Sequence, residues 1–222
     1  MSDREAHIKA FLGAAGWGDA ARMPVAGDAS ARRYERLTRA GEKAVLMDAP
    51  LNSDLPPEPD GATPDERAAL GYVAQARLAG ADPAAFLCVA NELTSRGFSA
   101  PRIFGADVDA GLILLEDLGD NMFAGVVGGN ADMERPLYEA AVDSLAAIYR
   151  SSFPDIFTYS DTRWRVKDYD ETALLAEMSL MENYYAPDTG VTLTAAEMDD
   201  WARLWRAAFT QISNHAPGLA LR

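Results

Sequence analysis

Short runs in which apolar and polar residues alternate dominate the first half of the chain, after one stretch with helical spacing. Ile8, Phe11 and Leu12 fall on one face of a helix that the pattern predicts over residues 3–15. The runs that follow are bounded by turn residues and predict strands. These strands are expected at residues 23–26, 32–38 and 43–48.

A proline-rich acidic segment, PLNSDLPPEPDGATP, follows the third strand over residues 50–64 and predicts a loop. Helical spacing resumes over residues 65–79. Asp82 and Pro83 then supply an N-cap and a first-turn proline for a third helix, which stops at Gly97. Two more strands are expected, at residues 102–106 and 111–116.

The pattern changes after Asp120, because helical spacing then continues as far as His215. The whole stretch is expected to be helical, with segments near residues 131–150, 168–185 and 194–214.

This order of elements predicts an α+β protein in which a five-stranded antiparallel sheet with one packed helix precedes a helical region. It is the outline of a two-lobe, protein-kinase-like phosphotransferase, although many α+β folds share it. The expected domains are a nucleotide-binding lobe at residues 1–116 and a helical lobe at residues 117–222.

The composition narrows the class of protein. Of the 222 residues 49% are hydrophobic, which suffices for the core of one domain or of two joined lobes. The net charge of −14 argues against nucleic-acid binding. No apolar run predicts a membrane span, and the amino-terminal residues lack the character of a signal peptide. Cys88 is the single cysteine, so we expect no disulfide, no zinc site and a cytoplasmic protein.

The segment GDASARRY opens on a turn that suits phosphate binding. Gly27 permits a positive φ angle, Ser30 offers a hydroxyl, and the backbone N–H groups of such a turn can cradle an anion. Arg32 and Arg33 begin the next strand, where neighbouring side chains point to opposite faces, so one of them can reach a phosphate. The alternative is an ordinary hairpin turn with a solvated arginine pair.

Several segments, taken in order, resemble the aminoglycoside phosphotransferase-like kinases: GDASARRYERL, KAVLMDAP, PAAFLCVANELTSRGFSAPRIF, GLILLEDLGD and YDETALLAEMSLMENYY. In detail they are similar to the bacterial branch that phosphorylates the anomeric hydroxyl of N-acetylmuramate and N-acetylglucosamine. The resemblance covers most of residues 20–185. It implies ATP and Mg²⁺ as cofactors, and an amino sugar or an aminoglycoside as the small-molecule substrate.

By this resemblance Gly27, Asp28 and Ser30 belong to the loop that covers the phosphates of ATP. Arg32 and Arg33 then supply the positive charge that phosphoryl transfer needs.

Two positions bear on how that charge is supplied. Met47 stands where most protein kinases carry a strand lysine, and Lys43 lies on the same face of the strand but two residue pairs away. The missing lysine makes Arg32 or Arg33 the better candidate for the phosphate contact, and of the two we favour Arg33. For Met47 the alternative is a packing residue of a buried strand.

Glu92 stands where the packed helix of a kinase carries its ion-paired glutamate, and a solvated glutamate is the alternative.

The apolar strand of LILLEDLGD runs into a polar segment that resembles a kinase hinge. There the Glu116 carbonyl and the Leu118 N–H are the groups expected to bind the adenine edge, and an edge strand that ends in a glycine turn is the alternative. Glu177 lies beside an apolar helical stripe and by resemblance contacts the substrate. His7 and His215 have no partner at a recognisable spacing, so neither is a good candidate for a general base.

Kinases of this class also need a catalytic Asp, a nearby Asn and a metal-binding Asp. In the resembling family that loop reads roughly His-x-Asp-x-His-x-x-x-Asn, and no segment of the 222 residues matches it. The catalytic residues are therefore expected just after Arg222, with no metal ligand before it. On this view the helical lobe is truncated, and the chain as given binds nucleotide weakly and transfers no phosphate.

Three hypotheses follow. The first, which we prefer, is a small-molecule kinase that in its intact form phosphorylates an amino sugar or an aminoglycoside with ATP. The second is a pseudokinase, that is, a nucleotide-binding or interaction module without catalysis. The third is an unrelated α+β binding domain in which GDASARRY is an ordinary hairpin.

Overall fold

The computed structural model describes residues 3–25, 32–50, 58–59, 61–78, 82–213, 215 and 218–220. The chain divides into two compact units. The first, called the sheet unit here, comprises Met1–Asn52 and Ala81–Val166; the second, the helical unit, comprises Ser53–Gly80 and Lys167–Arg222.

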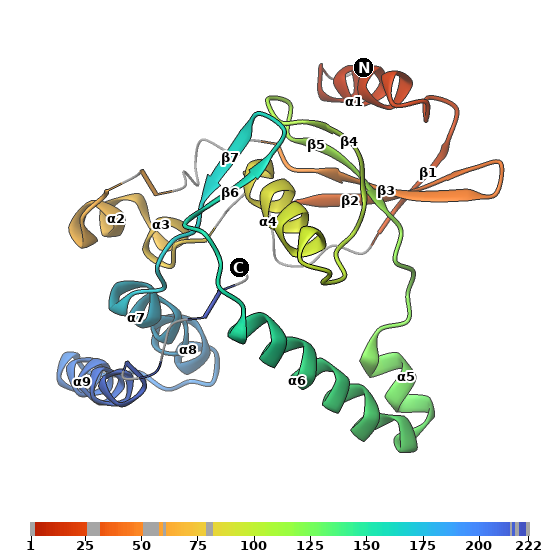
Figure 1. The fold of residues 1–222 in the computed structure, drawn as a ribbon. Coiled ribbons are helices and arrows are strands. Elements are labelled where there is room, and N and C mark those ends of the chain that lie inside the picture. The colour runs from red at the N-terminus through yellow and green to blue at the C-terminus, as the bar shows by residue number, and fades with distance from the viewer. Residues whose placement is uncertain are drawn as a thin grey trace. The chain divides into compact units, whose positions relative to one another are not determined.

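A five-stranded antiparallel sheet forms the centre of the sheet unit (Figure 1). The strands stand in the order β1-β2-β3-β5-β4, so the prediction of such a sheet is confirmed. β2 and β3 are joined by a tight turn in which Ala40 and Gly41 both have positive φ angles, as the commonest hairpin turns require. The strands are β1 (Ala21–Pro24), β2 (Arg33–Arg39), β3 (Glu42–Asp48), β4 (Ile103–Asp107) and β5 (Leu112–Glu116).

Apolar residues cover both faces of this sheet because side chains alternate along each strand. On one face, Leu37, Leu46 and Leu114 pack against Ile8 and Leu12 of helix α1 (Asp3–Ala14). On the other face, a second cluster brings residues of β3 and β5 against helix α4 (Pro83–Ser95). Its buried members are Met47, Ala49, Leu87, Ile113 and Leu115.

Helix α4 begins and ends where the sequence predicts. The Asp82 side chain accepts a hydrogen bond of 2.8 Å from the Ala84 N–H, and Pro83 occupies the first turn. Gly97, with a φ of 82°, follows the last turn.

The expectation of continuous helix after Asp120 is wrong in one place, since residues 156–165 form a two-stranded hairpin. Its strands β6 (Ile156–Tyr159) and β7 (Thr162–Arg165) are only four residues long each. The turn carries Ser160 at a φ of 49°, where Asn-Gly or Asp-Gly is the usual signal. The hairpin packs on α4, which buries Phe157. Helices α5 (Phe123–Gly129), η1 (Ala131–Met133) and α6 (Glu134–Arg150) precede it.

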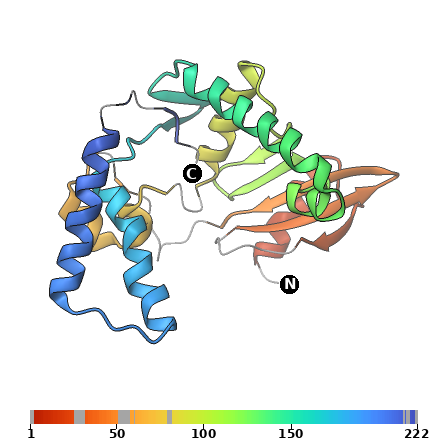
Figure 2. The ribbon, with the colours of Figure 1, turned by 90° about the horizontal axis from the view of Figure 1, so that it is seen from below.

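Helices build the described part of the helical unit. The helix predicted over residues 65–79 is broken at Gly71, whose φ of 95° separates α2 (Pro64–Leu70) from α3 (Tyr72–Gln75). Figure 2 shows α7 (Glu171–Leu180) and α9 (Ala195–Ile212) side by side. A π-helical turn η2 (Met181–Tyr185) and the short α8 (Ala186–Asp188) continue α7.

The α+β class is thus confirmed, while the domain boundary between residues 116 and 117 stays a prediction. Within the residues described above, none of the helices combines the length and the apolar character that crossing a bilayer requires.

Candidate functional site

Three residues of the expected phosphate loop, Gly27, Asp28 and Ser30, lie outside the described residues. Arg32 directly precedes β2 and is half-buried. Their expected roles therefore stay predictions.

Arg33 lies beside a buried carboxylate at the first position of β2. Its Nη2 is 2.7 Å from Oδ2 of Asp48, which is only 5% exposed and stands opposite it in β3. The Arg4 Nε of α1 donates a 2.9 Å hydrogen bond to the other oxygen of Asp48. Two guanidinium groups thus neutralise one carboxylate at the end of β3, on the α1 face of the sheet.

Met47 and Lys43 differ in their surroundings. Met47 is fully buried and packs in the cluster with Leu87 and Leu115, on the face that α4 covers. Lys43 is exposed. A buried methionine supplies no charge, so on this face of β3 Met47 contributes packing.

The Glu92 carboxylate pairs with a residue at the end of its own helix rather than with a residue of the sheet. Its Oε1 accepts a 2.5 Å hydrogen bond from the Arg96 Nε, one turn further along α4. Arg96 also donates to the Ser152 carbonyl and stacks over the Phe153 ring. In the described residues Glu92 therefore takes part in the contact between α4 and the segment after α6.

Glu116, at the end of β5, is tied to the start of β4. Its carboxylate accepts hydrogen bonds from the Arg102 backbone N–H at 3.1 Å and from the Arg102 Nη2 at 3.3 Å. These two bonds, the backbone one first, hold the pKa of Glu116 below its ordinary value. Its own N–H donates to the Arg102 carbonyl at 2.9 Å.

Leu118 follows β5 and presents its side chain to solvent, with an exposed fraction of 64%. Among the described residues its N–H has no hydrogen-bond partner. A backbone donor that directly follows an apolar buried strand can bind an acceptor on the edge of a nucleobase. This is compatible with the hinge role predicted for Leu118, which stays a prediction.

Arg36 was not predicted as a site residue, yet it binds the segment after β5. Its Nη1 and Nη2 donate to the two carboxylate oxygens of Asp120 at 2.9 and 2.8 Å, and its Nη2 also donates to Asp117 at 3.2 Å. The partners lie 81 and 84 residues away, so no local spacing could have revealed the contact.

Glu177 lies on α7 in the helical unit, where the Tyr72 hydroxyl donates a 2.7 Å hydrogen bond to its Oε1. Tyr72 belongs to α3, so this bond joins two segments of the unit that are distant in sequence. The substrate contact predicted for Glu177 stays a prediction.

A network of buried charges, also missed from the sequence, lies near the start of α7. Arg67, only 1% exposed, donates to both carboxylate oxygens of Asp170 at 3.2 and 2.7 Å. Arg77 binds Glu58 at 2.9 Å and approaches Asp170 at 3.3 Å. Burial opposes the ionisation of Asp170, but the hydrogen bonds from Arg67 and from the Ala173 N–H outweigh it and lower its pKa.

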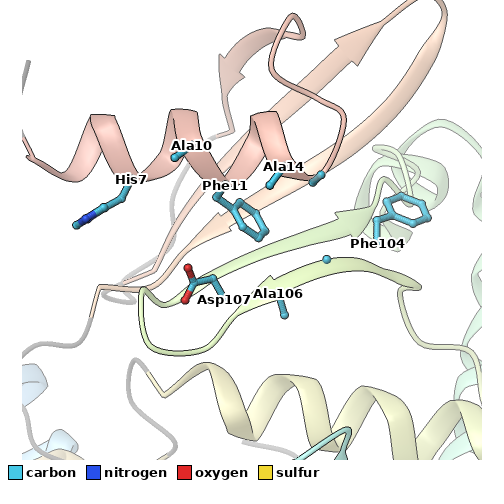
Figure 3. A pocket seen from close by; sticks show the side chains of 9 residues that line it. His7, Ala10, Phe11, Ala14, Phe104, Ala106 and Asp107 are labelled. Carbon is cyan, nitrogen blue, oxygen red and sulfur yellow. The ribbon is translucent and has the colours of Figure 1, made fainter.

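A pocket of about 550 Å³ lies elsewhere in the sheet unit, between α1 and β4 (Figure 3). Phe11 and Ala14 line it from α1, and Phe104 and Asp107 line it from β4. None of the described residues predicted to bind nucleotide lines it, so it is a separate pocket on the α1 side of the sheet.

The described residues hold no group of three or more His, Cys, Asp or Glu side chains that could bind a metal ion.

No protein-family profile matches the chain. The chain is similar to proteins named N-acetylmuramate/N-acetylglucosamine kinase. The one from Caulobacter vibrioides is 41% identical over 204 residues, which cover 92% of this chain and 56% of that protein. The one from Pseudomonas aeruginosa is 32% identical over 196 residues, or 86% of this chain and 46% of that protein.

A third such kinase, from Pseudomonas putida, is 28% identical over 178 residues, or 80% of this chain and 41% of that protein. The predicted resemblance to these sugar kinases is confirmed, whereas the wider placement among aminoglycoside phosphotransferase-like kinases stays a prediction. The chain spans about half the length of the curated relatives it matches.

Proposed function

We propose that this chain carries the nucleotide-binding part of an ATP-dependent sugar kinase with a protein-kinase-like fold. The observation that carries the proposal is the end of β5, where the apolar strand is followed by the exposed Leu118, whose N–H has no hydrogen-bond partner among the described residues. The similarity to named sugar kinases supports the same assignment. The protein would act in the cytoplasm, where ATP is available, and would bind neither nucleic acid nor membrane.

The roles of the residues follow from the predicted order of segments. The Glu116 carbonyl and Leu118 N–H would bind the adenine edge, and the loop of Gly27, Asp28 and Ser30 would cover the phosphates. Arg32 or Arg33 would balance their charge, in place of the lysine that Met47 replaces. Glu92, on α4, would take the position of the glutamate that other kinases pair with their strand lysine.

The substrate we propose is an amino sugar such as N-acetylmuramate or N-acetylglucosamine, because the similar kinases are named for these two sugars. Glu177 would accept a hydrogen bond from a hydroxyl of that sugar. A cationic aminoglycoside suits the net charge of −14, but none of the similar proteins reported above is named for one.

When bound, Mg²⁺ would neutralise the charge of the nucleotide phosphates. A second candidate function is nucleotide binding without catalysis. The aminoglycoside phosphotransferase-like placement belongs to the first candidate.

Nucleotide titration combined with a phosphotransfer assay tests both candidates. We expect ATP and ADP to raise the melting temperature and to bind in calorimetry. Phosphorus NMR with N-acetylmuramate then separates the kinase from the non-catalytic module. Absence of any thermal shift and of any calorimetric heat with millimolar ATP and ADP would contradict both candidates.

A further inference from the structure

We propose that Arg36 is a positioning residue of the nucleotide site, which fixes the segment Asp117–Asp120 so that the Leu118 N–H faces a nucleobase. This inference rests on the nucleotide-binding function proposed above. The segment concerned comes directly after β5, and Arg36 lies in the middle of β2.

The contact crosses the sheet. Arg36 stands opposite Val45 of β3, and Val45 stands opposite Leu115 of β5. The Arg36 side chain therefore reaches past a whole strand to the residues that follow β5. Because the three residues are in register, the contact ties the segment to the centre of the sheet rather than to a neighbouring loop.

The guanidinium group binds two carboxylates at once. Nη1 and Nη2 donate to the two oxygens of Asp120 at 2.9 and 2.8 Å, and Nη2 donates to Asp117 Oδ1 at 3.2 Å. Nε lies 2.8 Å from Asp117 Oδ2, in an ion-pair contact without hydrogen-bond alignment. The planar donor fork of arginine matches such a paired carboxylate, which a lysine ammonium group does not.

Asp117 couples this ion pair to the local turn. Its Oδ1 also accepts a 2.9 Å hydrogen bond from the Gly119 N–H, and Gly119 has a φ of 79°. One carboxylate thus fixes the turn on both sides of Leu118. The Asp117 side chain is only 5% exposed and that of Arg36 17%, so water competes little for the inner half of the contact.

These partners make Arg36 a poor candidate for a direct phosphate contact. Its donors are directed at Asp117 and Asp120, and the hydrogen bond from Arg36 keeps the pKa of Asp120 below its ordinary value. A guanidinium that already neutralises two carboxylates offers no net positive charge to an anion. Its effect on nucleotide binding would therefore pass through the conformation of the hinge.

The test compares Arg36→Gln and Arg36→Lys with Arg22→Gln as a matched control. Arg22 lies in the same sheet, in β1, and binds Glu5 and Glu35 rather than the hinge segment. Dissociation constants for adenosine, ADP and ATP are measured by displacement of a fluorescent ATP analogue, well below each variant's melting temperature.

We expect Arg36→Gln to raise the dissociation constants of adenosine, ADP and ATP by one common factor of about ten, because the backbone donor to the nucleobase is no longer pre-organised. Arg36→Lys is expected to restore little of the loss, and Arg22→Gln to bind like the wild type. Asp120→Asn, which alters only the exposed outer half of the contact, gives a smaller common factor and a safeguard if the Arg36 variants fold poorly.

Three results would overturn the inference. A larger loss for ATP than for adenosine would make Arg36 a phosphate contact. Unchanged dissociation constants in Arg36→Gln and Asp120→Asn, together with a lower melting temperature, would make the cluster merely structural. A wild-type protein that binds none of the three nucleosides and nucleotides would remove the proposed function first, and the inference with it.

Discussion

The two units of the chain bury different kinds of residue. In the sheet unit, leucine, isoleucine and methionine fill both faces of the sheet, and Leu37, Leu46 and Leu114 are completely inaccessible. In the described part of the helical unit, the buried apolar residues are five alanines and one phenylalanine. They are Ala74, Ala76, Ala173, Ala176, Ala186 and Phe209.

The helical unit also buries charged side chains. The longest fully buried side chain there is that of Arg67, and Glu58, which binds Arg77, is also buried. Alanine buries little apolar area, so packing alone stabilises this unit less than the sheet unit. The stability of the sheet unit therefore depends on buried apolar volume, whereas that of the helical unit depends on buried ion pairs.

The largest effect is expected from Leu114→Ala in the sheet. Leu114 is 0% exposed and packs in the cluster with α1, so its truncation leaves a cavity. We expect a loss of about 4 kcal/mol in the free energy of unfolding, measured by urea denaturation. Leu145→Ala on α6, where the side chain is 64% exposed, is the control and should change stability by less than about 0.5 kcal/mol. Similar losses in both variants would contradict a core centred on this cluster.

Arg67→Ala is expected to destabilise the helical unit by about 3 kcal/mol. It removes a buried cation and leaves Asp170 with its hydrogen bond from the Ala173 N–H and its longer ion-pair contact to Arg77. Hydrogen exchange should show the loss in α7 and α9 and not in the strands. Arg203→Ala, whose side chain is 66% exposed, is the matched control and should have no measurable effect. Exchange that rises equally in both units would mean that they are not separate in stability.

Acid is expected to destabilise the helical unit through Asp170. The folded state lowers the pKa of Asp170 below its ordinary 3.8, so the ionised carboxylate favours folding. This contribution is present above pH 3.8 and is lost as the pH falls through the lower folded-state value. Hydrogen exchange of α7 between pH 5 and 2.5 should follow it, and Asp170→Asn should weaken the dependence. An unchanged pH profile in Asp170→Asn would assign the acid sensitivity to other groups.

The smallest effect concerns Cys88, which reports on the sheet unit without changing it. The thiol is fully buried, and burial raises its pKa to about 11. We expect a thiol reagent at pH 8 to modify the native protein only through unfolding, so Leu114→Ala should accelerate the reaction and Arg67→Ala should not. Immediate modification of the wild type would contradict the burial of Cys88.

The sequence predicted the elements that a local pattern determines and missed the strands and contacts that no local pattern determines. Strand alternation and the Asp82-Pro83 signal were sufficient for the sheet and for α4, because local pattern and burial agree there. The hairpin at residues 156–165 was missed because its strands are four residues long and its turn lacks a glycine. Arg36 and Arg67 were missed because their partners lie far away in sequence, and no periodicity records such a pairing.

The predicted site is only partly described by the structure. The apolar strand before the predicted hinge lies where the pattern placed it, since an apolar strand that ends in Glu-Asp-Leu-Gly is a local signal, while the hinge role of Glu116 and Leu118 stays a prediction. The phosphate loop lies outside the described residues, and Glu177 has a partner, Tyr72, that no spacing predicts.

Hydrogen exchange of the wild type with and without a non-hydrolysable ATP analogue tests the central claim most directly. If the sheet unit binds nucleotide at the hinge, protection should appear in residues 112–120, with none in α9. Protection that is absent, or confined to the helical unit, would contradict a nucleotide site at the end of β5.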